Sequence, residues 1–156
     1  MKRARTLWLA SALTGVVVAL GQVLPGEGTQ RGIKFPEHDR QTGRIKSLLF
    51  GATAVQQPDG LVRVTGMRVE TYTYRDNTRA LEMIVEAPAC VFDFRTKTAS
   101  SSGPMKAYRA DGGLTLEGVG FRWCQTNSML SVSNQVRTLL RSDLFLSPPN
   151  TSPKKL

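Results

Sequence analysis

The chain has 156 residues, of which 21 are basic and 12 acidic, giving a formal net charge of +9. Its length fits one domain of ordinary size. The two cysteines are isolated from each other and from the single histidine, so the sequence lacks the ligand spacing of a zinc site. Because the basic residues are scattered, with no recognition helix to gather them, we expect no nucleic-acid partner.

The first residues indicate export. Lys2, Arg3 and Arg5 precede an uncharged, mostly apolar run over Leu7–Leu20. As a helix, at about 1.5 Å per residue, this run is shorter than the ~30 Å bilayer core. Residues 1–21 are therefore a cleaved signal peptide or, with the helix extended to Leu24, an uncleaved inner-membrane anchor. A buried N-terminal helix is the third alternative.

The rest of the chain divides into three parts by composition. Residues 22–42 are rich in Gly, Pro and charge without apolar periodicity, which predicts a linker. Residues 43–146 form the predicted domain. Residues 147–156 carry three prolines and a Lys-Lys pair, which predicts a disordered tail.

Apolar residues in the predicted domain alternate with a period of two, as in β-strands. Turn signals such as Pro58-Asp59-Gly60 and Ser102-Gly103-Pro104 separate the runs. We expect short strands at 61–65, 67–74, 81–86, 89–95, 114–117, 120–123, 129–133 and 136–140. This rhythm predicts an all-β fold, a sandwich, jelly roll or open barrel, preceded by one N-terminal hydrophobic helix.

An internal repeat supports stacked layers. When Glu86 is aligned with Glu117, an offset of 31 residues, the two copies continue without a gap. Cys90 then meets Phe121, and Phe92 meets Trp123. Such copies predict strand pairs that stack into a twisted roll with a continuous inner face.

The alternation also predicts which side chains point inward. Asp93 and Arg95 belong outside, so Cys90 faces inward, whereas Cys124 faces outward beside Trp123. Since their side chains point to opposite faces, we expect two free thiols rather than a disulfide.

Few residues of the chain are candidates for catalysis or metal binding. The only histidine, His38, lies in the predicted linker, and Glu86 and Glu117 are interpreted as equivalent strand-end positions of the repeat rather than an acid–base pair. We therefore expect no catalytic site, no metal and no cofactor.

What remains is the inner face, which is either a dry core or a groove that accepts lipid chains. The predicted inward set, and hence the candidate lipid-binding set, is Phe92, Phe94, Phe121, Trp123, Leu114, Leu116, Leu130, Val132 and Val136.

The strand rhythm over Leu48–Leu140 resembles the OstA-like β-jelly-roll proteins of lipopolysaccharide transport, the LptA and LptC family. The features that carry the resemblance are small residues before an aromatic strand (Ala87, Ala89, Phe92), an Asp-Gly turn (Asp111-Gly112) before the next layer, and the segment Ser131–Val136.

This resemblance implies a twisted open jelly roll of stacked antiparallel strands in the periplasm, which holds the acyl chains of lipopolysaccharide or a related glycolipid. It also implies edge-strand pairing with similar domains. The candidate edges are the strand near Arg44–Leu49 and the strand Val136–Leu140, and an uncleaved N-terminal helix would tether the domain to the inner membrane. The alternative is an exported structural or adhesive β-domain with a closed core and no lipid.

Overall fold

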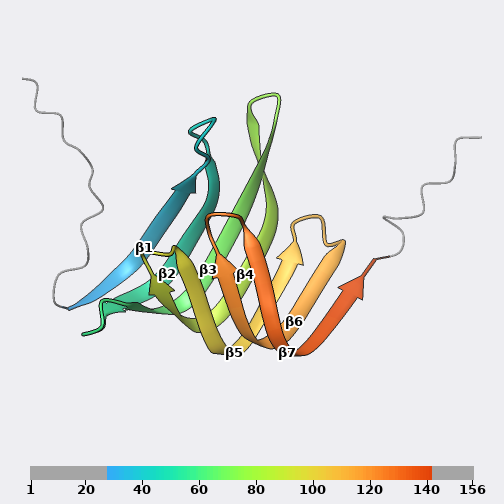
Figure 1. The fold of residues 1–156 in the computed structure, drawn as a ribbon. Helices are drawn as coiled ribbons and strands as arrows, with labels where there is room; N and C mark the ends of the chain where they lie inside the picture. Colours follow the sequence, from blue (N-terminus) through green and yellow to red (C-terminus); the bar gives the residue numbers. More distant parts are fainter. Residues whose placement is uncertain (1–27, 142–156) are drawn as a thin grey trace, which may run out of the picture.

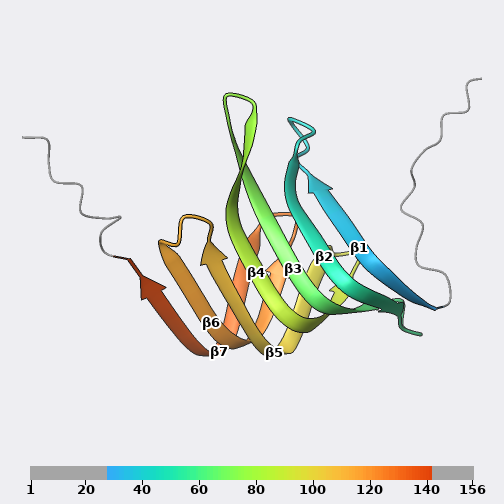
Figure 2. The same ribbon diagram turned by 180° about the vertical axis from the view of Figure 1, so that it is seen from behind.

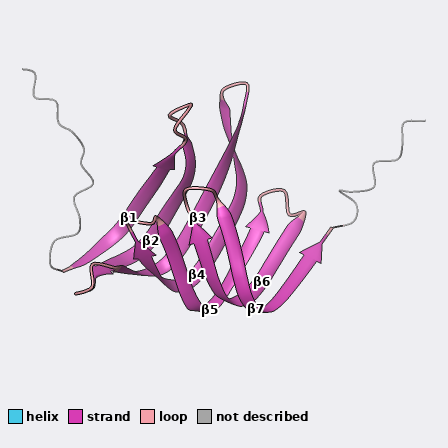
Figure 3. Ribbon diagram, viewed as in Figure 1, coloured by secondary structure: helices cyan, strands magenta, loops and turns pink. Residues whose placement is uncertain are grey.

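The structure is a computed structural model that describes residues 28–141. Seven strands form one antiparallel sheet in which each strand pairs with the next along the chain (Figure 1). They are β1 (Thr29–His38), β2 (Ile45–Gln56), β3 (Val62–Arg75), β4 (Thr78–Asp93), β5 (Thr98–Arg109), β6 (Leu114–Cys124) and β7 (Met129–Leu140). All regular structure in this part is strand (Figure 3). The predicted all-β open roll is confirmed.

Two predicted elements lie outside the described residues, the N-terminal helix within residues 1–21 and the tail over residues 147–156. Across residues 28–141 the structure contains no helix that is long and apolar enough to cross a membrane.

The sheet folds back on itself because its long strands bend near their middles (Figures 1 and 2). The pairing register shifts at these bends, between Glu86 and Val91 in β4 and between Ser101 and Pro104 in β5. Pro88 and Pro104 lie at these shifts, where the ladder is interrupted and proline is tolerated in an interior strand. Gly66 and Gly120 supply a positive φ of 57° and 75° on β3 and β6.

The bends correct the predicted strand lengths. The predicted strands 61–65 and 67–74 together correspond to β3, and 81–86 and 89–95 together correspond to β4. The expected turn at Ser102-Gly103-Pro104 is instead the bend inside β5. Glycine and proline mark the breaks in both cases, but here they bend a strand rather than end it.

The bends divide the sheet into two halves, which we call its arms, and the core lies between them (Figures 1 and 2). Burial alternates along the strands, so one face of each arm packs inward and the other meets solvent. The most deeply buried side chains include Leu49, Val69, Val85, Phe92 and Trp123.

The first strand is where the sequence prediction of a linker was wrong. β1 lies within residues 22–42 and forms one edge of the sheet. The predicted edge Arg44–Leu49 falls almost entirely in β2, which is therefore an inner strand. Ile33 is buried, at 8% exposure, and Phe35 packs on the core. The strand was predicted as a linker because it contains Gly32 and Pro36, and both residue types usually indicate loops. The other predicted edge, Val136–Leu140, is confirmed as part of β7.

The repeat is confirmed by the strand register. Phe92 pairs with Ala99 in the β4–β5 hairpin, and Trp123 pairs with Leu130 in the β6–β7 hairpin. Phe92 and Trp123 lie the predicted 31 residues apart, and so do Ala99 and Leu130. The two hairpins therefore share one register, and each is a layer of the roll.

Candidate functional site

Three of the nine predicted inward residues are buried in the core. Phe92, Phe121 and Trp123 have exposures of 1%, 3% and 0%. They lie on β4 and β6, where the two arms of the sheet face each other. Their inward direction was predicted correctly, and they form the dry part of the inner face.

The other six predicted residues are less covered. Phe94, Leu116, Leu130 and Val132 are partly buried against the core, Leu114 is half-buried, and Val136 is 54% exposed. Apart from Phe94, these residues lie on β6 and β7. The inner face therefore loses its cover toward the last strand.

The β1 side of the roll is closed by contacts that sequence reasoning missed. The ring of Phe35 stacks on Phe92 at a centroid distance of 5.4 Å and meets Phe94 edge-on at 4.8 Å. No signal for this cluster was visible, because Phe35 lies beside Pro36 in the segment predicted as a linker.

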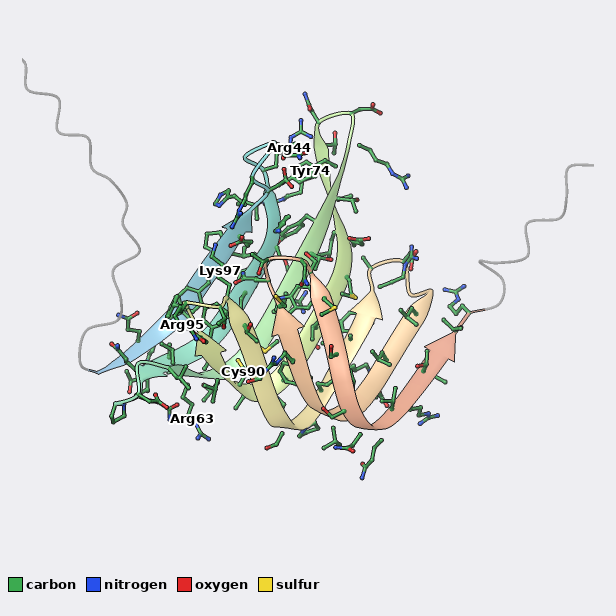
Figure 4. All side chains as sticks on the ribbon, in the orientation of Figure 1. Arg44, Arg63, Tyr74, Cys90, Arg95 and Lys97 are labelled. Carbon is green, nitrogen blue, oxygen red and sulfur yellow. The ribbon has the colours of Figure 1, made fainter. Side chains whose placement is uncertain are left out.

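Polar contacts strengthen the same closure. Gln125 is 2% exposed, and its Nε2 donates to the Phe35 carbonyl at 2.9 Å. The buried carboxylate of Glu37 pairs with Lys97, which lies beside β1 at the turn after β4 (Figure 4). These contacts join residues far apart in the chain, so the turns at 94–97 and 125–128 are fixed against β1.

The β7 end carries no such cover within the described residues. Its exposed apolar side chains are Met129, Val136, Leu139 and Leu140. Val136 and Leu140 are on the inner side, since they alternate with the outward Arg137. Sequence reasoning missed Leu140, although it follows Val136 by two periods of the alternation. An uncovered apolar edge of this kind marks a binding surface or an aggregation hazard.

The outer face carries a line of side chains across the whole sheet. We call it the cross-strand row, and its members, paired strand to strand, are Lys34, Phe50, Arg68, Glu86, Lys106, Glu117 and Arg137. A groove of about 820 Å³ runs beside it over β3–β7. Glu86 and Glu117 lie in this row at mid-strand, not at strand ends, and Lys106 separates them.

Arg68 is the most connected residue of the row. Its Nη1 donates to Glu86 at 2.6 Å and its Nε to Glu70 at 2.8 Å. The Tyr72 hydroxyl also donates to Glu70, at 2.6 Å. Burial alone would raise the pKa of Glu70, but the hydrogen bonds from Tyr72 and Arg68 outweigh it and the pKa is lowered. Burial, with the Glu70 hydrogen bond second, raises the pKa of Tyr72 to about 12.

Both cysteines are free thiols, as expected, and they differ in environment. Cys90 is buried, and burial raises its pKa to about 12. Cys124 is partly exposed, and the hydrogen bond with the Thr126 hydroxyl, at 3.3 Å, is the main cause that lowers its pKa. The predicted opposite directions of the two side chains are confirmed.

Residues 28–141 bring together no cluster of three His, Cys, Asp or Glu side chains that could hold a metal ion. His38 is the exposed last residue of β1, beside a register shift.

No protein-family model matches the chain, and a search of curated proteins gave no match. Among solved structures, the chain is similar to LptH of Pseudomonas aeruginosa. That structure is described as the LptA-homologous periplasmic component of the lipopolysaccharide transport device. The identity is 12%, the match covers 73% of this chain and 94% of that chain, and the TM-score is 0.45.

Proposed function

We propose that the domain is a periplasmic component of lipopolysaccharide transport that accepts acyl chains on its inner face at the β7 end. The observation that carries this proposal is the gradient of cover on that face. Trp123 is fully buried, whereas Val136 is 54% and Leu140 62% exposed. Apolar side chains left in water at the end of a core favour burial against an apolar ligand or partner.

This gradient of cover excludes the most deeply buried predicted residues from the candidate lipid site. Phe92, Phe121 and Trp123 would need the closed arms to separate before a chain reached them. The accepting residues in our proposal are Leu114, Leu116, Leu130, Val132 and Val136, together with Leu140. An acyl chain lying along them would bury their exposed area without disturbing the aromatic cluster around Phe35.

A photo-crosslinking amino acid tests this lipid contact. In a Gram-negative host, the cross-linker at Val136 should give lipopolysaccharide adducts. The cross-linker at Ser131, on the outer face of the same strand, is the matched control and should give none. Equal adducts at both positions, or none at Val136, would reject the lipid site.

The alternative function, a structural or adhesive domain with a closed core, is favoured by the complete burial of Phe92 and Trp123. It differs in one measurable respect. A lipid carrier should gain thermal stability when purified with lipopolysaccharide, because a ligand bound only by the folded state raises the melting temperature. A structural domain should show no change.

The second part of the proposal concerns partners and location. The free edge of β7 would pair with a strand of a similar domain, since an exposed edge offers unpaired backbone N–H and C=O groups. Residues 1–21 would export the chain, and their cleavage or retention decides whether it is tethered to the inner membrane. Mass spectrometry of the N-terminus of the exported protein distinguishes the two outcomes.

A further inference from the structure

The cross-strand row crosses all seven strands at a single level of the sheet. Each residue of the row pairs in register with the next, so the row begins with Lys34 on the β1 edge and ends with Arg137 on the β7 edge. A strand that extended the sheet beyond β7 in this register would place one of its side chains beside Arg137.

The charges in the row alternate over its last five strands. Arg68 pairs with Glu86 at 2.6 Å, and Lys106 pairs with Glu117 at 3.4 Å. Arg137 comes next, and among residues 28–141 it has no carboxylate within ion-pair distance. At the other edge, the Lys34 ammonium lies 5.8 Å from the centroid of the Phe50 ring. Both edges of the row are therefore cationic.

Opposite charges directly across a strand pair stabilise it, and like charges destabilise it. If two copies of this chain stacked β7 to β1, the same register would bring Lys34 of one copy beside Arg137 of the other. A strand with a carboxylate at that level would instead continue the alternation.

We propose that the β7 edge selects a partner strand from a different polypeptide that carries Asp or Glu at the level of Arg137, and that the Lys34–Arg137 encounter opposes stacking of this chain on itself. The inference rests on the edge pairing proposed above and adds the chemistry of the partner. On its inner side, the same strand would present apolar residues to cover Val136 and Leu140.

Sedimentation equilibrium of the full chain tests the selection without an identified partner. The variant Lys34→Glu turns β1 into a strand with a carboxylate at the required level, and Arg137→Glu reverses the charge at the other edge. Each single variant should self-associate about fivefold more tightly than the wild type. The double variant, with acidic residues at both edges, should return to the wild-type value.

Added salt provides a control. It screens charges at the edges, so it should reduce the difference in dissociation constant between the single variants and the wild type. Equal dissociation constants for all four proteins, or no association of any, would overturn the inference. Wild-type association as tight as that of Lys34→Glu would also overturn it and would identify a second copy as the partner. Lipid adducts at Val136 are measured separately, so failure of the lipid proposal and failure of the charge selection are distinguishable.

Discussion

Phe92 and Val136 face the same interior, yet Phe92 is 1% exposed and Val136 is 54% exposed. Phe92 is covered by Phe35 and the β1 side of the roll, whereas Val136 lies on the edge strand. By the repeat, Val136 is the counterpart of Met105, which is buried on β5. One pattern of apolar residues thus serves as core in one layer and as open surface in the next.

Truncation of these two side chains should therefore have very different effects on stability. Phe92→Ala leaves a cavity in the closed core and should cost about 3–5 kcal/mol of unfolding free energy. Val136→Ala should change it by less than about 0.5 kcal/mol, because the side chain is already half in water. Urea unfolding of both variants measures the difference. A large loss in Val136→Ala would show that the β7 end is covered in the free protein.

Gly118 should tolerate a side chain poorly. A Cβ at this position would lie 2.4 Å from Val132 Cγ1 and 3.2 Å from the carbonyl oxygen of Asn134. Gly118→Ala should therefore cost about 1–3 kcal/mol through overpacking between β6 and β7.

Gly103→Ala is the matched control, since Gly103 also lies inside a strand and its Cβ would meet only the Ser101 hydroxyl, at 3.3 Å. It should be nearly neutral in the same urea titration. Equal losses in the two variants would mean that strand propensity, and not the close approach of Val132, decides the cost.

The layered part of the fold could be predicted because its signal is local. Alternation and the 31-residue offset gave the inward direction of Phe92 and Trp123 and the equivalence of the two hairpins. The closure of the β1 side could not be predicted, since the contact of Gln125 with Phe35 spans 90 residues and leaves no local pattern. The bends were misread for a physical reason, because Pro104 and Gly66 have the same sequence signature in a turn as in a bulge.

The two thiols should differ sharply in reactivity, because the thiolate is the nucleophile. Iodoacetamide at pH 8 should label Cys124, whose pKa is lowered by the Thr126 hydrogen bond, and leave Cys90 unlabelled in the folded protein. Thr126→Ala should move the pH profile of Cys124 labelling to higher pH, whereas Thr126→Ser keeps the hydroxyl and should not. Peptide mass spectrometry assigns the label. Labelling of Cys90 at the rate of Cys124 would contradict its burial, and an intact mass that rises on reduction would contradict the free thiols.

Tyr72 should stabilise the protein in a pH-dependent way. The pKa of Glu70 in the folded protein is lowered, so its contribution is present above the unfolded pKa of a glutamate, about 4.3, and is lost as the pH falls through the folded value. Tyr72→Phe removes one hydrogen bond to the ionised carboxylate and should cost about 1–2 kcal/mol at pH 7. At pH 2, where Glu70 is less ionised than at pH 7, this cost should be smaller.

Tyr74→Phe provides the comparison for this pH dependence, because the Tyr74 hydroxyl donates to the uncharged Ile45 carbonyl at 2.9 Å. Its cost should be the same at both pH values, because this hydrogen bond involves no carboxylate. Urea unfolding of the wild type and both variants at pH 7 and pH 2 gives the four differences. If Tyr72→Phe loses as much stability at pH 2 as at pH 7, the Tyr72 hydroxyl does not act through the charge of Glu70.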